Sequence, residues 1–81
     1  MKAREVFEAC SNVVPLSVMN VCGSAADNAA ATINENGGRF VQGEFTDEFI
    51  SIWANTVVGI LNDFECEQEA RDWFESVGFR F

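Results

Sequence analysis

The sequence predicts a mainly α-helical protein, folded as a compact bundle of about four amphipathic helices. Two observations lead to this fold class. In four separate segments apolar residues recur every three or four positions, the spacing that places them on one face of a helix. A proline lies between the first two segments and glycines lie between the second and the third, which is typical of helix ends. A chain of 81 residues has room for one core, so we assign residues 1–81 to a single domain.

The first helix is predicted over residues 2–13. One arc of its helical wheel is apolar, and charged residues lie on the opposite side. The apolar arc consists of Ala3, Val6, Phe7, Cys10 and Val13. This helix has to stop near Val14, because the residue before a proline is pushed out of the helical conformation.

The second helix is predicted over residues 15–35. Pro15 suits the first helical position, where its missing N–H is not needed. Ser17 falls on the polar side, and Gly37 supplies the left-handed residue that ends the helix. The inward face consists of Val18, Met19, Cys22, Ala25, Ala26, Ala29, Ala30 and Ile33. Because much of this face is alanine, we expect another helix to approach it closely.

Residues 39–45 have no helical period and predict a loop or a short extended segment. Thr46 is the expected cap of a third helix over residues 46–63, and Asp47 and Glu48 place negative charge in its first turn, where the helix dipole favours it. The apolar arc of this helix consists of Phe49, Ile50, Trp53, Val57, Ile60, Leu61 and Phe64.

The same segment leaves a second fold class open. Its β-branched content is compatible with two strands over residues 48–62 that turn at Asn55 and Thr56, which would make the protein α+β. The helical period of the apolar residues favours the helix.

A fourth helix is predicted over residues 66–77, with Gly78 as its C-terminal cap. Its inward residues are Ala70, Trp73, Phe74 and Val77. Residues 79–81 are expected to form a short extended tail, a candidate to pair with residues 39–42.

The charge balance excludes several classes of partner. Thirteen acidic residues against five basic ones give a net charge of −8, so the chain has little with which to neutralise phosphates. We therefore expect no direct nucleic-acid contact and no binding to an acidic membrane. No run of roughly 18 apolar residues is present to span a bilayer. The expected location is the cytoplasm.

Catalytic and metal-binding groups are scarce. Histidine and tyrosine are absent, so the commonest general base and metal ligand is missing. The helical wheels place Cys10, Cys22 and Cys66 on apolar faces, and their odd number and wide spacing fit neither a zinc site nor a disulfide framework. We expect three free, inert thiols. Neither catalytic residues nor a cofactor nor a metal site is predicted, and the protein is expected not to be an enzyme.

The carboxyl-terminal region carries the first candidate binding site. Four carboxylates, which we call the acidic stripe, line the outer side of the predicted last helix: Glu65, Glu69, Asp72 and Glu75. Carboxylates on such a face lie about 5 to 6 Å apart, comparable to the phosphates of a nucleic-acid strand. The stripe therefore fits a basic groove of another protein. The alternative is a solvated face that only keeps the protein soluble.

A surplus of aromatic residues carries the second candidate. The chain is 48% hydrophobic and has eight Phe, more than a domain of this size easily buries. Five residues outside the helical arcs form the predicted aromatic patch: Phe40, Val41, Phe45, Phe79 and Phe81. We expect this patch to bind a partner or a second copy of the chain, and therefore expect a homo-oligomer.

The function expected from these features is binding. The leading hypothesis is a small, acidic, non-enzymatic protein that inhibits or adapts a basic or nucleic-acid-handling protein. In its small size, strong acidity and lack of catalytic groups the chain resembles phage-encoded inhibitors of bacterial defence systems, a likeness of composition that identifies no residue. Two alternatives remain: a structural homo-oligomerisation module, and a helical oligomer that binds or sequesters a small ligand.

Overall fold

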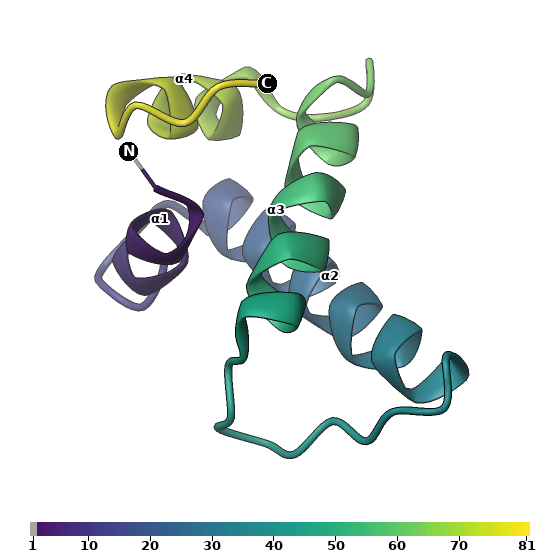
Figure 1. The fold of residues 1–81 in the computed structure, drawn as a ribbon. Helices are drawn as coiled ribbons and strands as arrows, with labels where there is room; N and C mark the ends of the chain where they lie inside the picture. Colours follow the sequence, from purple (N-terminus) through teal and green to yellow (C-terminus); the bar gives the residue numbers. More distant parts are fainter. Residues whose placement is uncertain (1) are drawn as a thin grey trace.

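Four helices and no strand are found in residues 2–81, the part of the chain that the computed structural model describes (Figure 1). They are α1 (Ala3–Ala9), α2 (Leu16–Glu35), α3 (Asp47–Leu61) and α4 (Gln68–Ser76). The predicted mainly α-helical class is confirmed, and the alternative with strands over residues 48–62 is not needed. The two long helices α2 and α3 cross in the middle of the molecule, α1 packs on α3, and α4 packs on α2 (Figure 1).

The core lies where α2 and α3 cross, around the fully buried side chain of Trp53. The Trp53 indole N–H donates a hydrogen bond to the carbonyl oxygen of Cys22 at 3.2 Å, which satisfies a buried donor. From α1, Phe7 lies edge-on to the indole, with ring centroids 5.1 Å apart. The small side chains of Ala25 and Ala29 are fully buried, in agreement with the predicted alanine-rich contact face of α2. Trp53 thus connects three helices.

The start of α3 and the end of α4 lie at the residues that the sequence indicates. Thr46 caps α3, with its Oγ1 accepting the N–H of Phe49 at 3.2 Å. Gly78 ends α4 with φ +82°, and the next residue, Phe79, donates its N–H to the carbonyl of Phe74 at 2.9 Å. The rings of Phe74 and Phe79 also pack together, which completes a Schellman motif.

The first helix is shorter than predicted. It ends at Ala9 rather than residue 13, because the N–H groups of Ser11 and Asn12 bond to carbonyls three residues back and tighten the chain into a turn. Val13, predicted to point inward, is fully exposed in the bend that follows. Pro15 precedes the first residue of α2 instead of occupying it.

The last turn of the predicted third helix is also absent. α3 ends at Leu61, and residues 62–67 form a separate connection before α4. The side-chain Oδ1 of Asp63 accepts the N–H of Glu65 at 3.0 Å, a local bond that competes with helix continuation. Phe64, predicted on the inward arc, is therefore 100% exposed.

Two residues of α2 lie on the opposite side from that predicted. Met19 is 54% exposed, and Ser17 is buried with 6% of its surface exposed. The buried face of α2 is centred on Val18, Val21 and Ala25, so the helix is rotated toward α4 relative to the expected orientation. The contact between α2 and α4, which the sequence pattern does not reveal, explains this rotation.

The prediction of three free cysteines is wrong for two of them. Cys10 and Cys22 form a disulfide that links the turn after α1 to the second turn of α2. Their Cα atoms are 6.6 Å apart, within the range that a disulfide spans. Cys66 is free and half-buried. Helical wheels treat each segment alone and cannot show that two cysteines on different segments face each other.

The predicted pairing of residues 79–81 with residues 39–42 does not form. The loop that contains residues 39–42 and the carboxyl-terminal tail lie at opposite ends of the molecule (Figure 1). The loop follows the end of α2, whereas the tail turns back at Gly78 along α4.

The disulfide gives a first test of the fold. Breaking it with the double substitution Cys10→Ser/Cys22→Ser should lower the free energy of unfolding by about 2 to 4 kcal/mol, because the unfolded chain loses a closed loop. Urea denaturation measures the change, and Cys66→Ser is the matched control that should have little effect. Equal midpoints for wild type and the double variant would contradict the assigned pairing.

Candidate protein-binding surface

The acidic stripe is divided between two elements. Glu69, Asp72 and Glu75 lie on the exposed side of α4, opposite the buried residues Ala70 and Phe74. Glu65 is exposed too, but it belongs to the connection of residues 62–67, because α4 begins only at Gln68. The predicted single helical row of four carboxylates is therefore wrong for Glu65.

Glu69 has a partner that joins two helices. The hydroxyl of Ser17 donates a hydrogen bond to Oε1 of Glu69 at 2.9 Å. Ser17 is the second residue of α2, so this carboxylate lies at the N-terminal end of α2, where the helix dipole favours negative charge. The bond holds the beginning of α4 against α2, which gives Glu69 a structural role.

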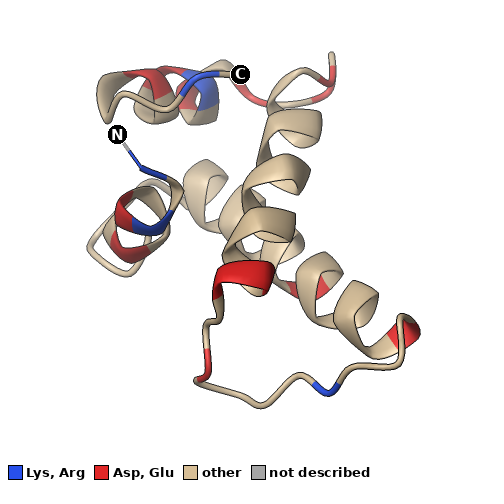
Figure 2. Cartoon of the chain, viewed as in Figure 1, with Lys and Arg blue, Asp and Glu red and all other residues tan. Residues whose placement is uncertain are grey.

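Arg71 is turned away from the acidic stripe. Its Nε donates to the carbonyl of Leu61 at 2.8 Å, and its Nη2 donates to the carbonyl of Asp63. Leu61 is the last residue of α3, so Arg71 caps the C-terminal end of that helix and fixes the following connection. Acidic residues dominate this end of the chain (Figure 2). The ion pair found in residues 2–81 joins Arg4 to Asp47, and no carboxylate of the acidic stripe is paired there.

A groove lies between the first half of α2 and the connection, and we call it the α2 groove. Its volume is about 240 Å³. The residues that line it are Ser17, Asn20, Val21, Ser24, Ile60, Glu65, Cys66 and Glu67. Val21 and Ile60 provide apolar surface, and Glu65 and Glu67 provide negative charge. Small-molecule pockets are usually about 300 to 1,000 Å³, so the α2 groove suits one or two side chains better than a whole small molecule.

Two exposed large apolar residues lie close in the chain to residues that line this groove. Phe64, which precedes Glu65 in the connection, is 100% exposed, and Leu16, one turn before Asn20 on α2, is 70% exposed. Single exposed apolar residues are common on protein surfaces, but exposed aromatic and aliphatic groups beside a groove are typical of interaction sites. The sequence pattern placed Phe64 in the core. The pair Asn62 and Asp63, which favours a turn, is the signal that the helix ends before it.

The structure does not bring the predicted aromatic patch together. Phe40, Val41 and Phe45 lie in the loop before α3, and Phe79 and Phe81 lie in the tail beyond α4. These segments are at opposite ends of the molecule (Figure 1).

Within each group most of the aromatic rings close an end of the core. The ring of Phe40 stacks on that of Phe49 at 5.1 Å, and the ring of Phe45 lies 4.7 Å from that of Phe7. Phe79 is buried. The five residues therefore do not form one continuous surface, although Val41, Phe45 and Phe81 each keep more than a third of their surface exposed.

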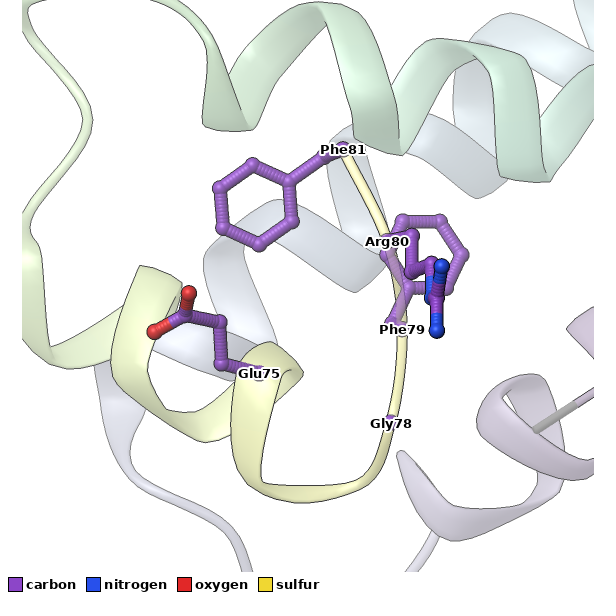
Figure 3. Close-up of a pocket in the computed structure, with 5 residues that line it drawn as sticks. All are labelled: Glu75, Gly78, Phe79, Arg80 and Phe81. Carbon is purple, nitrogen blue, oxygen red and sulfur yellow. The ribbon is translucent and has the colours of Figure 1, made fainter.

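A larger hollow lies beside the tail, with a volume of about 720 Å³ (Figure 3). The Glu75 carboxylate and the Phe81 ring lie on one side of the tail, and the Arg80 side chain lies on the other (Figure 3). All of the lining residues belong to one segment, residues 75–81. A hollow with walls from a single segment does not enclose a ligand as small-molecule sites do.

Two further observations bear on the class of protein. No helix within residues 2–81 combines the length and the apolar character needed to cross a membrane. Comparison of the chain with protein-family models, with characterised proteins and with solved structures finds no match.

The cap formed by Arg71 can be tested by substitution. Arg71→Met keeps the aliphatic part of the side chain but removes the donors to two carbonyls, and it should lower the free energy of unfolding by about 1 to 3 kcal/mol. Arg39→Met is the control, because it changes the charge equally at an exposed loop position. Urea denaturation of both variants measures the difference. Equal losses would show that the Arg71 hydrogen bonds contribute nothing specific.

Proposed function

We propose that this protein is a small, acidic, non-enzymatic binding protein that acts as an inhibitor or adaptor on a basic partner protein. The observation that supports the proposal most strongly is the orientation of Arg71. The base nearest in sequence to Glu69 and Asp72 is committed to the carbonyls of Leu61 and Asp63. The carboxylates of Glu65 and Glu75 are thereby left for an external cation. The Asp72 carboxylate accepts a hydrogen bond from the Gln68 side-chain amide at 2.9 Å and has no basic partner within residues 2–81.

Proteins that handle nucleic acids are the class of basic partner that this surface fits best. Their binding grooves attract evenly spaced negative charge, and an acidic helix face presents such charge. Asp72 and Glu75 lie three residues apart on α4, a separation of about 5 to 6 Å on a helix. The connection continues the negative surface through Glu65 and Glu67.

The absence of histidine and the structural contacts of the Ser17 hydroxyl and the Cys66 thiol support the non-enzymatic part of the proposal. The chain has no histidine to act as a general base. The hydroxyl of Ser17 is buried and donates to Glu69, and the thiol of Cys66 points to the carbonyl of Glu67 at 3.7 Å. These contacts hold the connection and α4 in place, which is a structural use of both groups.

The proposed place of action is the cytoplasm, and the Cys10–Cys22 disulfide makes that part of the proposal testable. Lasting disulfides are rare in a reducing cytosol and common in oxidising compartments. Alkylation of thiols in intact source cells, followed by mass spectrometry, measures the state of this pair. A reduced pair fits the cytoplasm, and a fully oxidised pair would move the protein to an oxidising compartment.

Self-assembly is the second candidate function, and exposed apolar side chains favour it. Within residues 2–81, seven large hydrophobic residues have more than a third of their surface exposed: Val13, Leu16, Met19, Val41, Phe45, Phe64 and Phe81. A homo-oligomer would bury some of them, as the composition predicts. Sedimentation at rising protein concentration distinguishes a self-assembling module from a monomeric binding protein.

The role of the acidic stripe is tested by neutralising it. The variant Glu65→Gln/Glu69→Gln/Asp72→Asn/Glu75→Gln changes the net charge from −8 to −4. Glutamine at position 69 keeps an oxygen that accepts the Ser17 hydroxyl, so the contact between α2 and α4 should persist. Affinity capture from a lysate of the source cells should lose a basic protein that the wild type retains at low salt. Association with that purified protein should be about tenfold slower and less dependent on salt, because surface charges act mainly on the association rate.

A matched control removes the same charge elsewhere. Glu5→Gln/Glu8→Gln/Glu35→Gln/Glu44→Gln also gives −4, at exposed positions of α1, the end of α2 and the loop before α3. This control should retain the captured protein. Loss of capture by both variants to the same extent would mean that net charge alone matters and would contradict a specific acidic surface.

A further inference from the structure

We propose that the α2 groove is the docking site for a basic segment of the partner that carries a large apolar side chain, with Phe64 as the anchor on this chain. The inference rests on the proposed function and assigns its location. The site combines the groove between α2 and residues 62–67, an exposed aromatic ring and carboxylates without a paired base.

The volume and the apolar surface of the groove determine which part of a partner fits into it. A volume of about 240 Å³ admits one or two side chains. The apolar surface inside comes from Val21, which is buried, and from Ile60, which is half-buried. An apolar side chain of a partner would therefore contact apolar surface already in place, and the polar groups of Asn20 and Ser24 would remain at the wall.

Phe64 is the proposed contact for the apolar side chain of such a segment. Its ring is 100% exposed, and it precedes Glu65, which lines the groove. Aromatic residues are enriched among the few interface positions that dominate binding, and their neighbours mainly exclude water. Leu16, 70% exposed and one turn from the groove residue Asn20, extends the apolar surface along α2.

The connection that carries Phe64 is held in place before any partner arrives. The Asp63 carboxylate accepts the Glu65 N–H at 3.0 Å, the Cys66 N–H donates to the Asp63 carbonyl at 3.1 Å, and Arg71 bonds to the carbonyls of Leu61 and Asp63. Binding to a preorganised surface loses less conformational freedom. An exposed ring on a fixed connection is thus suited to recognition.

Charge selects the occupant. Glu65 and Glu67 line the groove, and no basic residue does. A second copy of the chain docked through the same surface would place these carboxylates against their own equivalents, because a two-fold interface pairs a patch with itself. Like charges facing each other oppose that assembly, whereas Lys or Arg beside an apolar side chain complements both features of the groove.

Fluorescence anisotropy with synthetic peptides tests the proposal. The probe is a short labelled peptide of Lys and Leu at helical spacing. The controls are a Lys and Ser peptide of equal charge and a Glu and Leu peptide. The Lys and Leu peptide should bind most tightly, and Phe64→Ala should weaken it about tenfold or more. Circular dichroism should show the wild-type fold for Phe64→Ala, because the ring is fully exposed.

Matched variants locate the site. Phe81→Ala removes a partly exposed ring from the tail, and Asp72→Asn/Glu75→Gln removes the same charge from α4 as Glu65→Gln/Glu67→Gln removes from the groove. The groove variant should slow association and flatten its salt dependence more than the α4 variant, and Phe81→Ala should bind like wild type.

Several results would overturn the proposal. They are no binding of the Lys and Leu peptide, equal binding of the Lys and Ser peptide, wild-type affinity of Phe64→Ala, or Phe64→Ala converting a dimer of this chain to a monomer. The proposed function fails separately. If the acidic-stripe variant loses the protein captured from lysate while Phe64→Ala retains it, the docking site is wrong and the function stands. If the wild type captures no basic protein, the function itself is wrong.

Discussion

The structure depends above all on the burial of Trp53 where α2 and α3 cross. The indole is fully buried, donates to the Cys22 carbonyl at 3.2 Å and receives the edge of Phe7 from α1. Cys22 is also joined to Cys10, which follows Phe7 by one helical turn. Cys22 of α2 thus contacts α3 through a hydrogen bond and the turn after α1 through a covalent bond. A domain of this size buries a smaller fraction of its surface than a large one, so such a concentrated contact contributes much of its stability.

Two polar contacts connect the acidic carboxyl-terminal region to α2 and α3. Ser17 donates to Glu69 and holds α4 on α2, while Arg71 caps α3 and fixes the connection before α4. Both contacts use groups that a helical wheel places on a polar surface. Their combined effect is to bring Glu65 and Glu67 to the wall of a groove and to leave Phe64 in solvent. The proposed binding surface is therefore a consequence of how the last two helices are joined.

The helical period was sufficient to predict the fold class and all four helices, because each apolar face is repeated over several turns. It could not predict where local hydrogen bonds end a helix, and so it misplaced Val13 and Phe64. The helical period also could not predict contacts between segments, such as the Cys10–Cys22 disulfide, because these depend on tertiary packing. The acidic residues were found from the sequence, but the groove was not, since its walls come from α2, from Ile60 in α3 and from residues 65–67.

We propose that the α2 groove is preformed and receives the partner without any movement of the Trp53 crossing. Two-dimensional NMR of the labelled protein with the Lys and Leu peptide tests this claim most directly. We predict that amide shifts change within residues 16–24 and 60–69, while the Trp53 indole N–H resonance stays in place because the crossing does not move. Changes centred on residues 40–45 or 79–81, or a displaced Trp53 resonance, would contradict the claim.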